Sequence, residues 1–426
     1  MTGATVPPRV SAMAAGMAGS EILRVATDVA AHVASGHRVF DLSMGDFDPR
    51  QFPIPAMLRE GIEAALRDGQ TNYPAGPGMP ALRESIRAFS RERLGVDYPV
   101  ESVLAMSGAR PALYAAYRTL VDAGERVVFP VPSWQNPYYC QLVGAAPVVV
   151  PCDASTGFLP TRAALESAVR GARLLVLNSP ANPMGTMFDR ETLGSICDLV
   201  LEENARRAGG GRDRPLYLLY DQVYWMLTFG AVPHVTPVAL RPAMAPYTLS
   251  VDAISKSFAA TGLRVGWVLG PSDIVRSMAV FLGHVGAWAP RAEQVATAAL
   301  LQARDVVDAY HRTMTDGLRA RLDVLYQGIM AMRARGLPVD ATAPAGAMYL
   351  SARFALPVGD GSNEAIRTYL LREADFAAVP FQAFGVTEDS GWFRLSAGAV
   401  SVADIEAALP KVAAAVERAV SRTLVG

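Results

Sequence analysis

Lys256 lies in a segment whose residue types favour amine chemistry. It sits between Ser255 and Ser257, directly after an expected strand, and Arg264 follows eight positions later. A lysine amine at the end of a strand can act as a nucleophile when burial or neighbouring cations lower its pKa, because Schiff-base formation requires the neutral amine. An exposed lysine followed by an arginine in a turn would show the same letters, so this segment alone supports both alternatives equally.

A second segment, residues 107–110, has the composition of an anion site. Gly108 follows an expected strand and precedes an expected helix, so the backbone N–H groups at the start of that helix would point toward a phosphate. Gly108 would permit close approach, and Ala109 and Arg110 would contribute amides or a side chain. An ordinary strand-to-helix turn is the alternative for this segment taken alone.

Several segments, in the same order along the chain, resemble the fold-type I aminotransferases that use pyridoxal 5'-phosphate (PLP), namely the aspartate aminotransferase family of class I/II. Residues 255–266 resemble the lysine motif of this family, Ser-Lys-x5-Gly-x-Arg-x-Gly. Residues 178–185, Asn-Ser-Pro-Ala-Asn-Pro-Met-Gly, resemble its asparagine–proline loop, and residues 221–224, Asp-Gln-Val-Tyr, match it as well. The resemblance runs from about residue 40 to 400, and its strength lies in the joint pattern.

The resemblance implies that Lys256 holds PLP as a Schiff base and serves as general base and acid. Asp221 would pair with the pyridine nitrogen and so keep the ring an electron sink. The other residues that the resemblance places at the cofactor are Gly108, Ala109, Arg110 and Arg264 around the phosphate, Ser255 beside the lysine, Asn182 and Tyr224 at the ring phenolate oxygen, Trp134 on the ring face, and Tyr73, which would reach the phosphate of the neighbouring subunit. Taken singly, a helix N-cap for Asp221, a core position for Trp134 and a loop position for Tyr73 are the alternatives.

Arg394 resembles the arginine with which the family binds the substrate carboxylate. A guanidinium group grips a carboxylate through two parallel hydrogen bonds, and Gly45 would let the backbone approach the same group beside Asn182. A surface salt bridge is the alternative for Arg394. Trp288 occupies a place where many relatives carry Ser or Thr, and Phe381 replaces a glycine of the family. These two added rings argue against assigning aspartate as the substrate.

The activity implied by the resemblance is amino-group transfer from an L-amino acid to a 2-oxo acid by a ping-pong mechanism, with glutamate and 2-oxoglutarate as one pair. A homodimer with shared active sites is implied as well. A PLP lyase or decarboxylase on the same scaffold is the nearest alternative. A non-catalytic sensor is disfavoured because no DNA-binding module is recognisable. A nicotinamide enzyme is disfavoured because no Gly-x-Gly-x-x-Gly follows a strand.

The elements that must position these residues form an α/β pattern between about residues 100 and 270. Short, nearly continuous apolar runs alternate with helical segments such as Arg110–Val121 and Thr161–Arg170, which predicts a mainly parallel sheet covered on both faces. The expected strands are Ser102–Met106, Arg126–Phe129, Pro147–Val150, Arg173–Asn178, Pro215–Tyr220, Thr248–Ala253 and Gly266–Leu269. Because ligands bind beyond the carboxyl ends of such strands, the motifs lie where a site is expected.

A smaller α+β domain is expected after about residue 290. A long helical stretch from Ala292 to about Arg335 precedes strands near Ala347–Phe354 and Trp392–Leu395, and a final helix runs from Val402 to about Val420. The predicted division is an N-terminal arm with part of the small domain (1–45), a large PLP-binding domain (46–290) and a small C-terminal domain (291–426). The whole corresponds to the PLP-transferase fold type I.

The bulk composition excludes several classes of protein. With 426 residues and a formal charge of −1, the chain has neither the basic excess of a nucleic-acid protein nor a run of like charges. No apolar stretch approaches the length of a membrane span, and the N-terminus lacks the pattern of a signal peptide. Cys140, Cys152 and Cys197 lack metal-ligand spacing. We therefore expect a cytoplasmic enzyme with small-molecule substrates and no metal.

Overall fold

A seven-stranded sheet forms the centre of the molecule. The computed structural model describes residues 10–17, 19–210, 214–230 and 232–424. The sheet order is β2-β8-β7-β6-β5-β3-β4, in which only β8 runs antiparallel to its neighbours. The strands are β2 (Val103–Met106), β3 (Arg126–Val131), β4 (Ala146–Pro151), β5 (Ala172–Asn178), β6 (Tyr217–Asp221), β7 (Thr248–Ala253) and β8 (Gly266–Leu269). The predicted mainly parallel, seven-stranded sheet is therefore confirmed.

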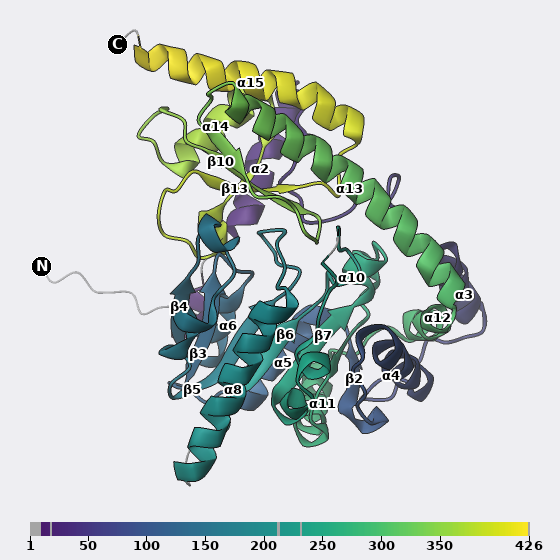
Figure 1. Ribbon diagram of the computed structural model, residues 1–426. Helices are drawn as coiled ribbons and strands as arrows, with labels where there is room; N and C mark the ends of the chain where they lie inside the picture. The colour runs from purple at the N-terminus through teal and green to yellow at the C-terminus, as the bar shows by residue number, and fades with distance from the viewer. Residues whose placement is uncertain (1–9, 18, 211–213, 231, 425–426) are drawn as a thin grey trace, which may run out of the picture.

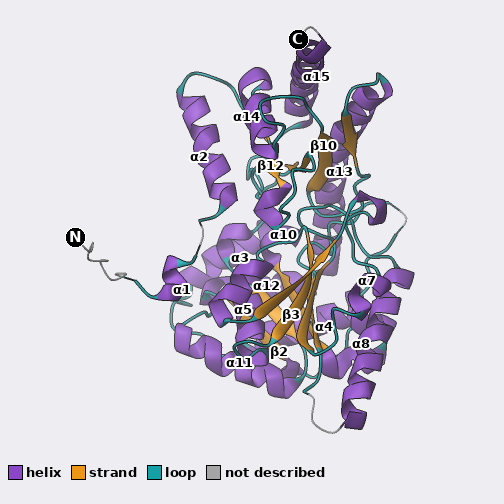
Figure 2. Cartoon of the chain, turned by 90° about the vertical axis from the view of Figure 1, so that its left-hand side faces the viewer, coloured by secondary structure: helices purple, strands orange, loops and turns teal. Residues whose placement is uncertain are grey.

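Helices cover both faces of this sheet, as Figure 2 shows. Alternate residues of one strand point to opposite sides: Val127 and Phe129 pack with α5 (Ala109–Leu120), whereas Val128 packs toward α8 (Arg190–Gly210). The remaining helices around the sheet are α3 (Ala56–Arg67), α4 (Pro80–Leu94), α6 (Asn136–Val143), α7 (Arg162–Glu166), α9 (Pro237–Leu240), α10 (Ile254–Ser257), α11 (Ser272–Val285) and α12 (Arg291–Gln302). The helix predicted at Thr161–Arg170 is shorter than expected, since α7 ends at Glu166 and residues 167–171 form turns.

A smaller antiparallel sheet stands above the carboxyl ends of the central strands (Figure 1). Its order is β12-β13-β10-β9, and a separate parallel pair joins β1 to β11. These strands are β1 (Phe40–Asp41), β9 (Val339–Ala341), β10 (Tyr349–Phe354), β11 (Phe376–Ala377), β12 (Val379–Pro380) and β13 (Trp392–Ser396). The predicted strands near 347–354 and 392–395 are thus present. The pairing of β1 with β11 joins the N-terminal segment to the C-terminal part of the chain.

The long helical stretch expected after residue 291 consists of two helices. α12 ends at Gln302, and α13 (Arg304–Ala334) begins after Ala303, whose ψ of +73° breaks the helix. The other helices of this part are α2 (Glu21–Ala34), α14 (Asn363–Ala374) and α15 (Val402–Leu424), whereas the short α1 (Ala12–Ala15) lies beside the helices of the large sheet (Figure 2). Among the described residues, no helix is both long and apolar enough to cross a membrane. The domain boundaries at residues 45 and 290 stay a prediction.

Candidate active site

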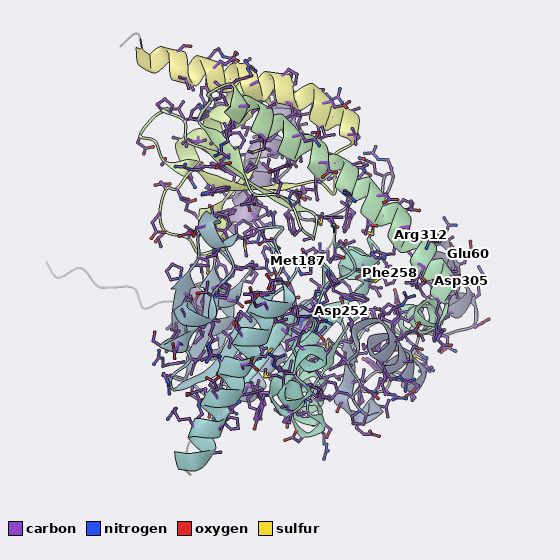
Figure 3. The ribbon with its side chains drawn as sticks, in the orientation of Figure 1. Glu60, Met187, Asp252, Phe258, Asp305 and Arg312 are labelled. Atoms are coloured by element: carbon purple, nitrogen blue, oxygen red, sulfur yellow. The ribbon has the colours of Figure 1, made fainter. Side chains whose placement is uncertain are left out.

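Lys256 lies in the short helix α10, which directly follows the central strand β7. Figure 3 labels Asp252 and Phe258, which flank this segment in the chain. The Lys256 Nζ atom donates a hydrogen bond to the carbonyl oxygen of Gly45 at 2.7 Å. Burial, together with the positive charges of nearby arginines and against the opposing effect of Asp46, lowers the pKa of Lys256 to about 8. The amine is thereby brought closer to the neutral form that a nucleophile or base requires.

Asp221 ends the neighbouring strand β6, and its carboxylate is buried. One side-chain oxygen accepts a hydrogen bond from the backbone N–H of Val223 at 3.2 Å. Burial raises the pKa of Asp221 to about 6. In the part of the chain that the structure describes, no lysine or arginine forms an ion pair with this carboxylate. A buried carboxylate without a cationic partner is costly, so this position fits a ligand that brings a protonated nitrogen.

The asparagine–proline loop is fastened to the end of β6. Asn178 Nδ2 donates to the backbone oxygen of Asp221 at 2.9 Å, and Asn178 Oδ1 accepts from the backbone N–H of Asn182 at 2.7 Å. Both X-Pro bonds of the loop, before Pro180 and Pro183, are cis. The two hydrogen bonds of Asn178 hold Asn182 above the sheet, where its Oδ1 accepts from Arg394 Nη1 at 3.1 Å.

Arg394 is 1% exposed and packs among aromatic rings. Its guanidinium carbon lies 4.6 Å from the ring centre of Tyr349 and 5.0 Å from that of Phe384. Nη2 donates to the backbone oxygen of Ser43 at 2.7 Å, whereas Nε has no hydrogen-bond partner among the described residues. The hydroxyl of Tyr349 in turn lies 2.8 Å from that of Tyr224. The guanidinium group of Arg394 is therefore fixed in place, and its Nε–H group remains able to donate a hydrogen bond to a ligand.

A positively charged recess lies at the start of α5. Arg264 Nη2 donates to the backbone oxygen of Ser107 at 3.1 Å, and a Cβ atom at Gly108 would clash with that same nitrogen. Gly108, with a φ of +89°, is the residue that permits this approach. Burial lowers the pKa of Arg264, and the charge of Arg110 lowers it further. Two neighbouring guanidinium groups at a helix N-terminus favour a bound anion such as a phosphate.

These groups converge on one cavity of about 440 Å³. The predicted residues that line it are Gly45, Ala109, Arg110, Trp134, Asn182, Asp221, Tyr224, Ser255, Lys256, Arg264 and Arg394. Gly108 packs against Arg264 at its edge. Tyr73 does not line this cavity: it is 83% exposed, and its ring lies 5.3 Å from that of Trp288. Phe381 is buried in an aromatic cluster with Phe158 and Trp392 and does not reach the cavity either.

The comparisons with known proteins agree with this geometry. The family described as Aminotransferase class I and II matches residues 37–412. An aspartate aminotransferase from Rhizobium meliloti (strain 1021) is 30% identical over 411 residues, which cover 94% of each chain. This chain belongs to the class I and II aminotransferases.

Solved structures show the same relationship for the aminotransferase. The crystal structure of the aspartate aminotransferase from Rhizobium meliloti superposes with a TM-score of 0.86 at 28% identity, covering 96% of this chain and 99% of that one. An aromatic aminotransferase from Pyrococcus horikoshii OT3 superposes with a TM-score of 0.79 at 25% identity, covering 92% and 99%. The fold expected from the sequence, that of the fold-type I PLP enzymes, is confirmed.

The aminotransferase is PLP-dependent, as its family is, and the residues of the cavity fit that cofactor. The Asp221 carboxylate without a cationic partner suits a pyridinium nitrogen, and the two guanidinium groups of Arg110 and Arg264 suit a phosphate. The depressed pKa of Lys256 suits an amine that condenses with an aldehyde.

Several residues of the aminotransferase cavity escape the sequence prediction. Asp46 accepts a hydrogen bond from the Thr261 hydroxyl at 2.8 Å, and both line the cavity. Tyr349 links Tyr224 to Arg394, as described above. Asp46 directly follows the predicted Gly45, and Thr261 lies inside the lysine motif, so proximity to a motif was the available signal. The apolar residues from α2 that line the cavity, Ile22, Leu23 and Ala26, carry no such signal.

Proposed function

We propose that this aminotransferase exchanges an amino group between L-amino acids and 2-oxo acids by a ping-pong mechanism, with glutamate and 2-oxoglutarate as one pair. The observation that carries the proposal is the position of Lys256. Its amine, with a pKa lowered to about 8, shares one cavity with Asp221 and with the carboxylate-binding fork of Arg394. One cavity therefore holds side chains suited to the proposed roles of base, electronic partner for the cofactor and substrate anchor.

The proposed cofactor site uses groups at or after the carboxyl ends of five strands, namely β2, β3, β5, β6 and β7. Asp221 would hold the proton on the pyridine nitrogen, and Asn182 and Tyr224 would donate to the phenolate oxygen. Arg264, Arg110 and the amides that follow Gly108 would bind the phosphate, with Trp134 on the ring face and Ser255 beside the lysine. When bound, PLP supplies a conjugated ring that accepts the electron pair of the substrate Cα–H bond.

Lys256 is proposed to move the proton. When PLP is bound, Lys256 Nζ would take the proton from the substrate Cα atom as general base and would deliver it to the C4' carbon of the cofactor as general acid. Gly45 O, which accepts from Nζ at 2.7 Å, orients the amine on the side of the loop 43–46. Arg394 would hold the α-carboxylate through both nitrogens of its fork, which fixes the Cα atom relative to Lys256.

The substrate side chain is proposed to lie against α2. Ile22, Leu23 and Ala26 form an apolar wall of the cavity, and the positive groups that line the cavity in this chain are Arg110, Lys256, Arg264 and Arg394. All four have proposed roles at the cofactor or at the α-carboxylate. An amino acid with an apolar side chain therefore suits one half-reaction, whereas the relatives named aspartate aminotransferases support a dicarboxylate such as glutamate for the other.

A homodimer with shared sites is also proposed. The exposed Tyr73 and the partly exposed Trp288 form an aromatic pair away from the cavity of their own chain, and the Trp288 Nε1 atom is buried without a partner among the described residues. Such a pair suits a surface that a second copy covers, where Tyr73 would reach the partner's phosphate. We also propose a cytoplasmic location, which the three unpaired cysteines support.

The function is tested by a screen of amino acids against the purified, PLP-loaded enzyme. Each is mixed alone, and then with 2-oxoglutarate, while the cofactor absorbance and the products are followed. We expect one turnover of cofactor without the oxo acid and continuous transamination with it. Continuous ammonia or carbon dioxide release without any oxo acid would overturn the proposal in favour of a lyase or decarboxylase.

The shared site is tested by mixing two inactive variants, Lys256→Ala and Tyr73→Ala. A mixed dimer would contain one site with both residues intact, so activity should return on mixing. Sedimentation that shows a monomer, or no recovery from subunits shown to exchange, would contradict the shared site.

A further inference from the structure

A cluster of metal-ligating side chains lies outside the active site, where α2 meets the end of α14. His32 Nε2 and His37 Nδ1 lie 3.1 and 3.0 Å from the same oxygen, Asp375 Oδ1. The two imidazole rings are stacked, with their centres 4.1 Å apart and their planes inclined by 20°. The three ligand atoms all lie within 4.8 Å of one another. Two imidazole nitrogens and one carboxylate oxygen are therefore close enough together to bind one ion.

The backbone holds these three residues in place. His32 lies in the last turn of α2, and Gly36, with a φ of +96°, turns the chain so that His37 follows on the same side. Asp375 caps the C-terminal end of α14 with a φ of +54°, and its backbone oxygen accepts from the N–H of Phe40 at 2.8 Å. The ligands thus come from segments that the pairing of β1 with β11 already fixes together.

The second oxygen of the carboxylate is engaged separately. Lys411 Nζ lies 2.9 Å from Asp375 Oδ2, which leaves Oδ1 to the two imidazoles. Outer partners of this kind orient a ligating carboxylate. The side chains of His32 and Asp375 are 14% and 18% exposed, whereas that of His37 is 48% exposed, so water can complete a coordination sphere from the His37 side.

We propose that His32, His37 and Asp375 bind a divalent transition-metal ion, with Zn²⁺ as the best match. Zn²⁺ binds imidazole nitrogen at about 2.0–2.1 Å and carboxylate oxygen at about 2.0–2.2 Å, which brings its ligands to the separations of roughly 3 Å that the nitrogens already have from Asp375 Oδ1. Three protein ligands leave one position for water. Hard ions such as Mg²⁺ prefer oxygen ligands and do not suit the two imidazoles.

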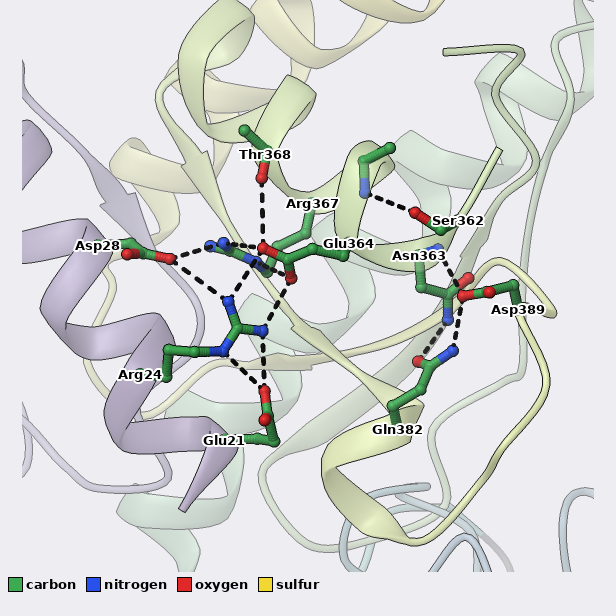
Figure 4. A network of polar contacts seen from close by, with 11 residues as sticks. Glu21, Arg24, Asp28, Ser362, Asn363, Glu364, Arg367, Thr368, Gln382 and Asp389 are labelled. Carbon is green, nitrogen blue, oxygen red and sulfur yellow. Dashed lines mark hydrogen bonds and ion pairs between the residues drawn. The ribbon is translucent and has the colours of Figure 1, made fainter. Parts of the chain in front are cut away.

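The ion would hold α2 against α14, because His32 lies on α2 and Asp375 lies at the C-terminal end of α14. The opposite end of α2 is held by a network that Figure 4 shows: Arg24 bonds Glu21 and Glu364, while Asp28 bonds Arg367. α2 also supplies the apolar wall of the active-site cavity. The proposed ion therefore stabilises an element next to the substrate without touching the reacting groups.

The test is equilibrium dialysis of the tag-free, PLP-loaded enzyme against ZnCl₂, with the bound metal quantified by atomic emission. We expect one ion per chain. His32→Gln and His37→Gln should weaken binding by more than about tenfold, since loss of an outer partner alone costs about tenfold to hundredfold. His284→Gln is the matched control, because His284 is an exposed histidine on α11, distant in sequence from the cluster, and should keep the ion.

Thermal unfolding gives a second measurement. Zn²⁺ should raise the unfolding temperature of the wild type and of His284→Gln, but not of His37→Gln, whose exposed side chain can be replaced without disturbing the core. Absence of a bound ion in the wild type, or equal binding by the wild type and His37→Gln, would overturn the proposal. Because PLP is present in every sample, metal held by the cofactor cannot produce the expected difference.

Discussion

The floor and the α2 wall of the active site are built in opposite ways. The floor consists of charged and polar groups at the ends of buried strands, with Lys256 after β7, Asp221 on β6 and Arg264 before β8. The wall consists of apolar side chains on one helix, among them Leu23, which is 68% exposed, and the helix is held by partly exposed ion pairs such as Arg24 with Glu364. Exposed pairs contribute little stability each, typically about 0–1 kcal/mol. In the proposed function, the strand ends would fix the reacting groups, whereas α2 would shape the choice of substrate.

The largest loss of activity is expected from Lys256→Ala, a substitution in the floor of the active site. Loss of a general acid–base group costs about 10²–10⁴-fold in rate, and loss of cofactor attachment adds to it, so turnover should become undetectable in a coupled assay. Borohydride treatment of the wild type should fix the cofactor on the peptide that contains Lys256. The only other lysine of the sequence, Lys411, serves as the internal control and should stay unmodified. Normal turnover by the variant would refute the assignment.

Asp221→Asn should reduce kcat by about 10²-fold or more, because it removes a preorganised charge from the reacting system. Asp252→Asn is a stringent control on the adjacent strand. Asp252 is also buried, and burial raises its pKa to about 8 while Trp225 Nε1 donates to it at 2.7 Å. Asp252 does not line the cavity, so its replacement by the amide should cause a much smaller loss of kcat. Equal losses for the two variants would remove the distinction between a functional and a structural carboxyl group.

Arg394→Lys tests whether Arg394 binds the α-carboxylate of the substrate. A lysine cannot reproduce the planar fork, and charged hydrogen bonds contribute about 1.5–3 kcal/mol. The KM for every amino acid should therefore rise by about 10- to 100-fold, with the cofactor absorbance retained. Arg353→Lys, on the same small sheet but bonded to the exposed backbone of Ser390, should leave the KM unchanged.

The pH dependence of cofactor attachment tests the environment of Lys256. Attachment needs the neutral amine, so the rate of reconstitution of the cofactor-free enzyme should rise with pH up to about 8 and level off above it. The charge of Asp46 raises the pKa of Lys256, so Asp46→Asn should move this midpoint to lower pH. Stopped-flow absorbance measures both profiles. A midpoint near the ordinary lysine value would contradict the buried position of the amine.

The smallest change in activity is expected from a substitution in the α2 wall. Leu23→Ala removes apolar contact worth about 0.8 kcal/mol per buried methylene group, so kcat/KM for apolar amino acids should fall by about 3- to 10-fold while that for aspartate stays constant. Val33→Ala is a control on the same helix, since Val33 is exposed and does not line the cavity. An equal change for aspartate would show that α2 does not contact the substrate side chain.

The floor was also easier to predict from the sequence than the wall. The strands of the large sheet were predictable because continuous apolar runs end at residues such as Asp221 and Lys256, whose charged side chains are costly to bury without a partner. Tyr349 and Leu23 were not predictable as cavity residues, because a tyrosine or leucine fits the core equally well. The break at Ala303 was also missed, since the residues on both sides are good helix formers and tertiary packing decides where the chain turns.

α13, which begins directly after Ala303, has a mechanical consequence. Its 31 residues form one unbroken rod, about 46 Å long at 1.5 Å per residue. One end adjoins α12 beside the large sheet, and the other reaches the small sheet and α15 (Figure 1). A tilt of only about 5° at Ala303 would carry the far end by roughly 4 Å. A small change in the backbone torsion angles of Ala303 would therefore displace the far end of α13 by about the diameter of an atom.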